Sequence, residues 1–410
     1  MGSAPSGPLS GVRIVDLTTV LMGPYATQIL GDMGADVIKV EPPQGDGSRA
    51  IGPMRSPGMG GLFMHVNRSK RSIVLDLKKP SGRDALLRLA KTADVLIYNV
   101  RPQAMARLGL AYDDVATVNP RIIYVGTYGY GQGGPYAAKP AYDDLIQGAV
   151  GIPSLGMAAG ADQPRYVPCT IADRTVGLSA VGAVSAALYH RERTGQGQSI
   201  GIPMFETMAQ FVLGDHFSGR SFEPPLGPTG YPRLLSKSRR PYPTSDGYVC
   251  TLIYNDKQWK NFFALIGRPE VTETDPRFAD LESRSLHIDD LYGMVAGILA
   301  TRTTAYWLEE LEKADIPVMP LNTMDSLIED PHLAAVGFFK TVEHPTEGAF
   351  RSMAVPSTWS ASQPEPERLA PRLGEHSVEL LREAGLGDEA IAALLAERAA
   401  VQADPAARRD

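Results

Sequence analysis

Residues 11–41 read GVRIVDLTTVLMGPYATQILGDMGADVIKVE, and they contain two strand-like runs separated by a helical one. Val12–Thr19 is rich in β-branched residues, and Ala35–Glu41 is a second run of the same kind. Between them, Gly23 and Pro24 open a helical segment that continues through Met33. A helix between two strands is typical of a βαβ unit, which predicts a parallel sheet.

The same alternation continues further along the chain. An amphipathic helix begins at Pro80, and a short helix follows Pro102. Further strands are expected at Ser72–Leu77, Asp94–Val100 and Arg121–Thr127. The whole pattern predicts an α/β fold in which helices cover both faces of a parallel sheet.

A long helix is expected from Arg174 to His190, where almost every residue is apolar or small. A helix that is apolar all round is usually buried, so this one is predicted to lie in the core. Ser199–Met204 then reads as a strand, and another helix begins at Phe205.

The composition changes near Phe222, where a proline-rich region begins. A strand at Gly247–Tyr254 and several helices follow, through about Asp330. We therefore expect residues 223–330 to form a second, smaller domain. Two short strand candidates and a pair of C-terminal helices come after it.

Composition and charge indicate a globular enzyme. The 410 residues are 43% hydrophobic and 21% charged, which is sufficient for a large core without disulfides. The net charge of -6 argues against a general nucleic-acid-binding protein, which needs a basic surface. No stretch long enough to span a bilayer lacks charges or helix breakers, so no membrane association is expected.

The cysteines and the N-terminal segment indicate the cellular compartment. Cys169 and Cys250 suggest no disulfide framework and fit a reducing environment. The segment MGSAPSGPLS has no charged region followed by an apolar one, so no signal peptide is expected and the prediction is cytoplasmic. The seven histidines show no metal-ligand spacing, so no metal site is predicted.

Several segments together resemble one family, the class III CoA-transferases, which includes formyl-CoA:oxalate and carnitine CoA-transferases and the α-methylacyl-CoA racemases. In chain order they include LSGVRIVDLTTVLMGPYATQILGDMGADVIKVEPPQGD, NRSKRSIVLDLKKPSGRDALLRLAKTADVLIYNVRP, PAYDDLIQGAVG, ADRTVGLSAVGAVSAALYHRERTGQGQSI and APRLGEHSVELL. The similarity covers nearly the whole chain and is more specific for the family than for the substrate.

The resemblance implies both an architecture and an activity. Residues 1–222 and 331–410 would form a Rossmann-like large domain built from both chain ends, with residues 223–330 inserted as a smaller α+β domain. Two chains would interlock as a homodimer. The implied reaction is the reversible transfer of CoA between an acyl-CoA and a carboxylic acid. The coenzyme A thioester is then a substrate, and no tightly bound cofactor is expected.

Asp173 lies where the family keeps its covalent nucleophile. It directly precedes the apolar helix predicted from Arg174, so the free N–H groups and positive end of that helix should favour its ionised form. An ionised carboxylate attacks a thioester carbonyl, giving an aspartyl anhydride and then an aspartyl-CoA thioester. From position alone an N-cap is the commoner role. Both roles are compatible if Thr170 or a ligand caps the backbone.

Tyr142 and Asp143 occupy the point at which the family divides. The racemases carry a His-Asp pair here and use the histidine as an acid and base, whereas this chain has Tyr142 at that position. A tyrosine, with an ordinary pKa of about 10, is a poorer proton carrier near neutrality. The resemblance therefore favours a transferase, with an α-methylacyl-CoA racemase as the alternative. Asp143 has two equally good interpretations, a functional residue or a helix cap.

The resemblance also places the CoA contacts. They fall at Val20 and Leu21, near Leu75, at Asn99 and Val100, and at Arg107, which is the list of residues expected to bind the substrate. Arginine suits a phosphate because its guanidinium is always charged and bonds in a bidentate manner. The alternative is that Arg107 is an ordinary charged residue on the exposed face of a helix.

The loop EPPLGPTGYPRLL differs from the glycine-rich lid of formyl-CoA transferases, since it holds only Gly227 and Gly230. Tyr231, Arg233 and the pair at 239–240 follow closely. These side chains would either meet an acceptor carboxylate or remain as solvated loop charges.

One glycine motif matches a dinucleotide-binding pattern without its structural context. Residues 129–134, GYGQGG, satisfy the dinucleotide-binding pattern after a strand, which is the basis of a NAD-dependent oxidoreductase interpretation. That loop must lead straight into a helix. Here Pro135 and Pro140 follow, so NAD binding is not expected.

Overall fold

The computed structural model of the chain describes residues 7–404, so part of the N-terminal segment discussed above lies outside the described residues. The chain forms two compact units. Unit 1 comprises Met1–Val150, Pro168–Ala209 and His332–Asp410, and unit 2 comprises Gly151–Val167 and Gln210–Pro331. The expected domain limits at residues 222 and 330 stay a prediction.

A seven-stranded sheet forms the centre of unit 1. Its strands are β1 Arg13–Leu17, β2 Asp36–Glu41, β3 Lys70–Leu75, β4 Val95–Tyr98, β5 Ile123–Tyr128, β6 Gln198–Pro203 and β12 Ala400–Val401. Six of them pair in parallel in the order β3-β2-β1-β4-β5-β6, and β12 adds to β3 in the antiparallel direction. The predicted α/β fold with a large parallel sheet is confirmed.

The strand order reverses between β1 and β4, which is the topological switch point of a doubly wound sheet. Ligands of such sheets bind beyond the carboxyl ends of the strands at this point. Residues that directly follow β1 and β4 are therefore the first place to look for a site.

The helices of unit 1 lie between and beside these strands. They are α1 Met22–Asp32, α2 Gly61–Val66, α3 Pro80–Lys91, α4 Pro102–Arg107, α5 Tyr112–Val118, α6 Asp143–Ala149, α8 Ile171–Thr194, α17 Ser377–Glu383 and α18 Asp388–Ala396, with a 3-10 turn at Gly47–Ala50. A hairpin of β10 Phe339–His344 and β11 Gly348–Met353 belongs to the same unit. α9 (Met204–His216) and α16 (Pro331–Ala335) lie where the chain passes between the units.

The two faces of the sheet differ in chemistry because strand side chains alternate. One face is apolar and packs against α3, α5, α17 and α18, with Val15, Ile38 and Ile73 at its centre. On the opposite face Asp16 and Lys39 are adjacent in the register of β1 and β2. That face meets α1 and α8, so charged groups are buried on the side where the site is expected.

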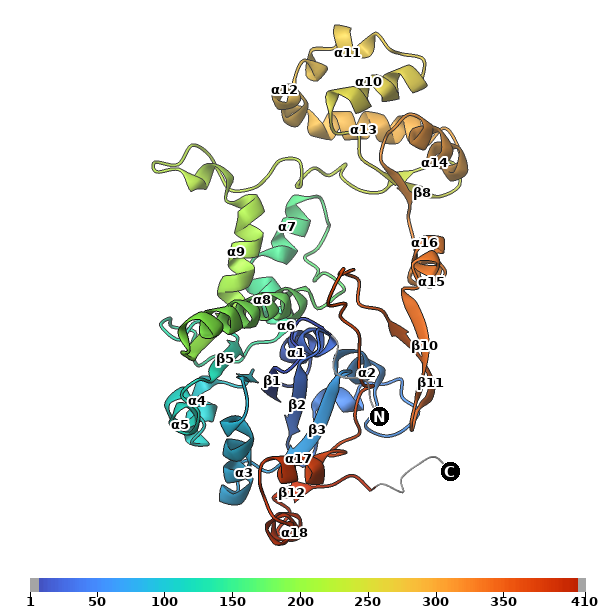
Figure 1. Ribbon diagram of the computed structural model, residues 1–410. Helices are drawn as coiled ribbons and strands as arrows, with labels where there is room; N and C mark the ends of the chain where they lie inside the picture. Colours follow the sequence, from blue (N-terminus) through green and yellow to red (C-terminus); the bar gives the residue numbers. More distant parts are fainter. Residues whose placement is uncertain (1–6, 405–410) are drawn as a thin grey trace. The chain divides into compact units, whose positions relative to one another are not determined.

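The C-terminal end of the chain returns to its N-terminal part (Figure 1). In that view the red strand β12 lies beside the blue strand β3, and Ala400 is the register partner of Leu75. Unit 1 therefore contains both chain ends, and this strand was not expected from the sequence. The expected helix pair before it is confirmed by α17 and α18.

The prediction that the long apolar helix is buried all round is wrong. α8 buries one face against α1, β5 and β6, with Val176, Gly177 and Ala180 among its buried residues. On the other face Leu178 is 54% exposed and Tyr189 is 64% exposed. The apolar residues on all sides of the helix indicate that each face can be buried. They do not indicate that every face is buried within a single chain.

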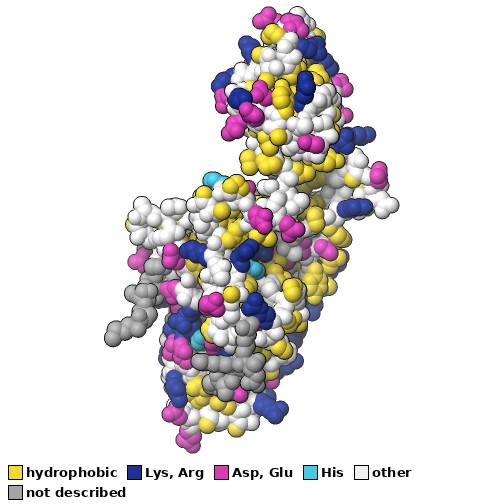
Figure 2. Space-filling view, turned by 90° about the vertical axis from the view of Figure 1, so that its right-hand side faces the viewer, with side chains coloured by type: hydrophobic (Ala, Val, Ile, Leu, Met, Phe, Trp, Pro, Cys, Tyr) yellow, Lys and Arg dark blue, Asp and Glu magenta, His cyan; other side chains and the backbone are white. Residues whose placement is uncertain are grey.

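α8 is also the one helix within residues 7–404 that is long and apolar enough to cross a membrane, judged by length and composition. Its contacts with α1 and with strands β5 and β6 make it a structural part of unit 1. Positive and negative side chains are interspersed over the visible surface (Figure 2), as expected for a modest net charge of -6.

Unit 2 has its own aromatic core, which includes Trp259, Phe262 and Phe263. A three-stranded antiparallel sheet with the order β7-β8-β9 packs with several short helices. The elements are α7 Ile152–Ala158, β7 Tyr242–Pro243, β8 Tyr248–Thr251, α10 Asp256–Leu265, α11 Val271–Thr274, α12 Leu281–Leu286, α13 Ile288–Leu299, α14 Thr304–Lys313, β9 Val318–Pro320 and α15 Met324–Ile328, with 3-10 turns at Ser218–Ser221 and Pro276–Phe278.

Candidate functional site

The loop between β1 and α1 is held in an uncommon backbone conformation. Val20 has a φ of 68°, a left-handed value that β-branched residues rarely adopt. Its N–H donates to both carboxylate oxygens of Asp46, at 3.1 and 3.2 Å. Asn99 accepts a hydrogen bond from the Thr19 N–H at 3.0 Å and donates one to the Thr19 carbonyl at 2.8 Å. The loop is therefore fixed from both sides.

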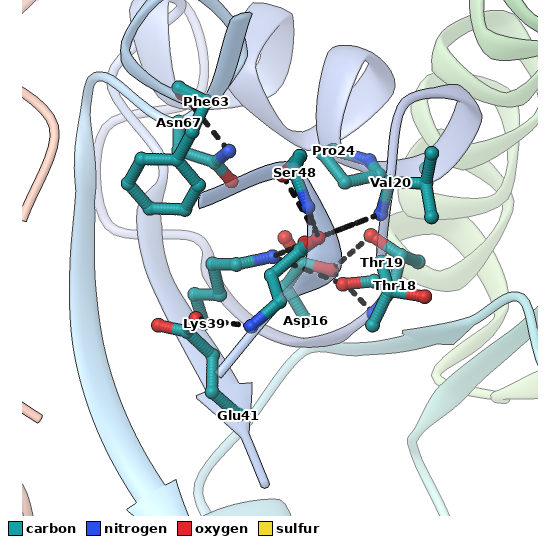
Figure 3. Close-up of polar contacts among 12 residues, drawn as sticks. Asp16, Thr18, Thr19, Val20, Pro24, Lys39, Glu41, Ser48, Phe63 and Asn67 are labelled. Atoms are coloured by element: carbon teal, nitrogen blue, oxygen red, sulfur yellow. Dashed lines mark hydrogen bonds and ion pairs between the residues drawn. The ribbon is translucent and has the colours of Figure 1, made fainter. Parts of the chain in front are cut away.

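A fully buried ion pair supports this loop. Lys39 Nζ lies 2.8 Å from Asp46 Oδ2, and neither side chain is exposed. The same ammonium donates to the Thr18 carbonyl at 3.0 Å (Figure 3). Burial alone would raise the pKa of Asp46, but the Lys39 ammonium and hydrogen bonds from Ser48 outweigh burial and lower it to about 2. Asp46 therefore stays ionised and holds the Val20 N–H.

A second buried ion pair joins β1 to β3. Lys70 Nζ lies 3.1 Å from Asp16 Oδ2, and both side chains are fully buried. Asp16 also accepts hydrogen bonds from the Thr18 N–H and the Thr27 hydroxyl, at 2.9 and 2.6 Å. Lys70 donates to the Pro24 carbonyl at 3.0 Å. The pair thus connects the strands to the first turn of α1.

The charges of this pair depend on one another. Burial alone would raise the pKa of the Asp16 carboxyl. The ammonium groups of Lys70 and Lys39 outweigh burial and leave that pKa below its ordinary value. Sequence reasoning did not single out any of these residues. The available signal was a charge inside the otherwise apolar strands RIVDL and DVIKVE, because a charge there is buried and must be paired.

The N-terminal parts of α1 and α8 pack closely together. A Cβ at Gly177 would lie only 2.8 Å from the Met22 carbonyl oxygen, so the contact requires glycine. The guanidinium of Arg174 lies over the ring of Tyr25 at 4.3 Å from its centroid. Asp173 precedes Gly177 by one helical turn, so it lies on the side of α8 that faces α1.

Gly177→Ala is expected to push α8 away from α1. Inserting a methyl into such a contact typically costs about 1–3 kcal/mol. Gly182 lies on the same helix, is exposed and would place its Cβ in open space, so Gly182→Ala should stabilise by about 0.5–1 kcal/mol through helix propensity. Denaturant midpoints of both variants measure the difference. Equal midpoints would show that the helices do not meet at Gly177.

Asp173 is the third residue of α8 and not its N-cap. The helix begins at Ile171, three residues before the predicted start, because the Arg174 N–H already donates to the Thr170 carbonyl at 3.0 Å. Thr170 is the N-cap, and its side chain makes no capping hydrogen bond. The predicted position of Asp173 directly before the helix is therefore wrong, although it does lie in the first turn.

Asp143 lies directly beside Asp173. It is the buried first residue of α6, and its Oδ1 accepts a hydrogen bond from the Asp173 N–H at 2.9 Å. Its Oδ2 accepts one from Gln147 Nε2 at 2.6 Å. Asp143 thus accepts a hydrogen bond from a free N–H at the start of α8 and does not cap its own helix. The neighbouring N-cap residue Tyr142 is 69% exposed, so it is not packed against the helix.

The environment of Asp173 favours its neutral form. Burial raises the pKa of the carboxyl, the negative charge of Asp143 raises it further, and Arg174 lowers it, which leaves the pKa at about 7. The expectation that the helix terminus keeps this carboxyl readily ionised is wrong, because burial and the adjacent carboxylate outweigh it. The side chain is partly buried, neither sealed in the core nor fully open.

All the predicted CoA contacts except Arg107 fall at the carboxyl ends of strands of the one parallel sheet. Val20 and Leu21 follow β1, Leu75 ends β3, and Asn99 and Val100 follow β4. The structure brings Val20 and Asn99 together through Thr19, as described above. The side chains of Leu21 and Leu75 are buried, whereas Val100 is exposed.

Arg107 is the last residue of α4, and its side chain is exposed. Within residues 7–404, no hydrogen bond or ion pair joins it to the strand ends or to Asp173. The same part of the chain holds no group of three or more His, Cys, Asp or Glu residues that could bind a metal ion.

Comparisons with known proteins agree with the predicted resemblance. A family model described as CoA-transferase family III matches residues 9–377. The chain is 35% identical over 397 residues to succinate–glutarate CoA-transferase of Agrobacterium fabrum, covering 92% of this chain and 95% of the relative. It is 37% identical over 339 residues to acetyl-CoA:oxalate CoA-transferase of Acetobacter aceti, covering 81% and 85%.

A solved structure shows the same fold. The crystal structure of an aspartate-to-alanine variant of Rv3272 from Mycobacterium tuberculosis matches with a TM-score of 0.78 and 30% identity, covering 91% of this chain and 98% of that chain. Sequence and fold similarity both extend over nearly the whole chain. The chain therefore belongs to CoA-transferase family III and is an enzyme of that class.

Proposed function

We propose that the protein transfers CoA between carboxylic acids and that Asp173 is the covalent nucleophile. The observation that carries this proposal is the position of Asp173. Its carboxyl lies in the first turn of α8, beside Asp143, on the face that packs against the start of α1. The start of α1 follows β1 at the switch point of the sheet, where such folds bind their ligands.

The reaction consists of four acyl transfers at one carboxyl group. The Asp173 carboxylate attacks the acyl-CoA carbonyl, forming a mixed anhydride and releasing CoA thiolate. The thiolate attacks the aspartyl carbonyl, which frees the donor carboxylate and leaves an aspartyl-CoA thioester. The acceptor carboxylate attacks this thioester and releases the thiolate again, and the thiolate then takes the acceptor acyl group. Asp173 is regenerated as a carboxylate, and no net proton is consumed.

The raised pKa of Asp173 fits this chemistry. Burial and the charge of Asp143 disfavour the ionised carboxylate, which is the form that must attack. Both intermediates are neutral at Asp173, so the same surroundings stabilise them relative to the starting carboxylate. A dry site also protects the anhydride and the thioester from water. The environment therefore drives the carboxylate toward its acylated forms.

The pH dependence tests this interpretation. A carboxyl with a pKa of about 7 gains its reactive form as the pH rises, so kcat/KM for the acyl-CoA should fall about tenfold per pH unit below that value. Asp143→Asn removes the neighbouring negative charge and should move this fall to lower pH, while burial keeps the pKa above its ordinary value. Initial rates between about pH 5 and 9 provide the measurement. An identical acid limb in both proteins would contradict the role assigned to Asp143.

Arg107 is proposed to bind a phosphate of CoA. Removing hydrogen bonds to a charged group costs about 1.5–3 kcal/mol. Arg107→Ala should therefore raise the KM for acyl-CoA by about tenfold or more, with a smaller change in kcat. Arg88→Ala, on the exposed face of α3, is the matched control and should leave KM unchanged. An unchanged KM in Arg107→Ala would remove this residue from the CoA site.

The acids are proposed to be dicarboxylic. One relative described above is named for succinate and glutarate, and the other for acetyl-CoA and oxalate, so each name includes at least one acid with a second carboxylate. A panel of dicarboxylic and matched monocarboxylic acceptors, with chromatographic detection of each new thioester, tests the proposal. Faster transfer to the monocarboxylic acids would contradict it.

A homodimer is proposed from the exposed face of α8. Leu178, Gly182, Ala186 and Tyr189 are all exposed and lie three or four residues apart, which places them in one stripe along the helix. A second copy of the chain would cover this stripe. Light scattering should give a mass of two chains, and Leu178→Glu should lower it. A wild-type mass of one chain at micromolar concentration would exclude the dimer.

A further inference from the structure

A cationic pocket lies entirely within unit 2, and it is lined by arginines in and shortly after the loop at residues 223–235. Its volume is about 360 Å³. Its lining includes Arg233, Arg239, Arg240, Tyr242 and Tyr292, and no Asp or Glu. Three guanidinium groups around one hollow are therefore not neutralised by its walls.

None of these arginines has a carboxylate partner among residues 7–404. Other arginines of unit 2 do: Arg277 lies 2.7 Å from Asp275, and Arg284 lies 2.5 Å from Asp256. Unpaired arginines are common on open surfaces, but these three line one hollow whose walls carry no carboxylate, so their charges all favour an anion there.

Arg233 is the most constrained of the three. Its guanidinium lies 5.8 Å from the ring centroid of Tyr231 and 5.7 Å from that of Tyr254. One Nη donates a long hydrogen bond of 3.4 Å to the Tyr292 hydroxyl, and its Nε is buried with no hydrogen-bond partner. A buried donor without a partner costs free energy, so a group that accepts from this guanidinium would be stabilised.

The backbone that carries Arg239 and Arg240 is anchored at its start. Asp289, on α13, accepts a hydrogen bond from the Ser236 hydroxyl at 2.6 Å and another from the Ser238 N–H at 3.0 Å. Arg239 and Arg240 in turn donate backbone hydrogen bonds to Ser236 and Ser238, both at 3.1 Å. The nearby acid is thus used to fix the loop and not to neutralise the arginines.

The other end of the segment is anchored as well. Tyr242 is buried in β7, which pairs with β8. Its ring meets that of Tyr292 edge to face at 6.4 Å. The backbone that carries Arg239 and Arg240 is therefore fixed before any ligand arrives, which lowers the entropy cost of binding.

We infer that this pocket binds an oxyanion group of a substrate. Guanidinium groups match planar carboxylates and phosphates with paired hydrogen bonds. Two sources share this chemistry, the free carboxylate of a dicarboxylic acid and a phosphate of CoA. That the bound group is one of these two depends on the proposed function. That the pocket binds an oxyanion at all depends only on the geometry of unit 2.

Calorimetric titration of the full-length protein tests the inference. The probes are glutarate, adenosine 3′,5′-bisphosphate, and butyrate as a matched monocarboxylate. The double variant Arg239→Gln/Arg240→Gln should weaken binding of glutarate or of the bisphosphate by about tenfold or more, because charged hydrogen bonds are lost. The exposed Arg268→Gln, in the same unit, is the control and should change neither constant.

The outcomes separate the two sources. A loss confined to glutarate assigns the pocket to a dicarboxylate, and a loss confined to the bisphosphate assigns it to CoA. Wild-type protein that binds neither probe, or pocket variants that bind both as well as wild type, would overturn the inference. Arg240→Glu repeats the test with a single exposed residue, and an unchanged melting temperature shows that the variant is folded. Because no acyl-CoA is present, failure of the proposed chemistry would leave this binding result intact.

Discussion

Asp173→Ala is expected to abolish CoA transfer, with a loss on the order of 10⁴-fold or more, because removing a covalent nucleophile leaves only binding and orientation. Alanine also removes the carboxyl whose pKa is raised to about 7 by burial and by Asp143. The fold should survive, because alanine suits a helix and the Asp173 N–H remains available to Asp143. The measurement is the rate of formation of a new thioester, followed by chromatography.

The matched control is Asp144→Ala. Asp144 is exposed in the first turn of α6, one residue after Asp143, so its removal should leave the rate almost unchanged. Hydroxylamine provides an independent readout, since it converts an acylated aspartate to a hydroxamate that mass spectrometry can locate. Wild-type enzyme that transfers CoA with no modification at Asp173 would refute the nucleophile.

Asp16→Ala is expected to cause the largest loss of stability, about 3–5 kcal/mol. The substitution would leave the Lys70 ammonium buried without its carboxylate, and it would remove the acceptor of the Thr18 N–H and the Thr27 hydroxyl. A domain is typically stable by only about 5–15 kcal/mol, so the variant should unfold at much lower denaturant concentration. Urea unfolding followed by circular dichroism measures the loss.

Asp84→Ala serves as the control for this change. Asp84 pairs with Arg83 at 2.8 Å, but both side chains are exposed, so the expected change is within about 0.5 kcal/mol. The pH dependence has a defined sign. Asp16 has a folded pKa below its ordinary value of 3.8, so its contribution is complete above that pH and is lost as the pH falls below it. Equal midpoints for the two variants would show that the buried pair contributes nothing.

Local patterns were sufficient for most of the sheet. The predicted runs around β1, β2, β4 and β5 coincide with observed strands to within a few residues, because β-branched runs between helices are decided by short-range periodicity. Strand order was not accessible in this way. The pairing of β12 with β3 joins residues more than three hundred positions apart, and no local signal indicates such a contact.

The family and the location of its nucleophile were also available from the sequence. The motif around Asp173 gave the residue, but its position relative to the helix was wrong by one turn, because the apolar run began to look helical only at Arg174. The direction of its pKa shift was wrong for a related reason. A helix terminus is visible in the sequence, whereas the carboxylate of Asp143, thirty positions away, is not.

The sequence by itself determined the succession of strands and helices, the family, and which aspartate to examine. Only the tertiary structure decided that Lys70 meets Asp16 across 54 positions, that Asp46 holds Val20, and that two carboxyls share one corner of the site. The physical reason is that periodicity and propensity act over a few residues. Charge pairing and desolvation depend instead on which distant residues the folded sheet places within a few ångströms.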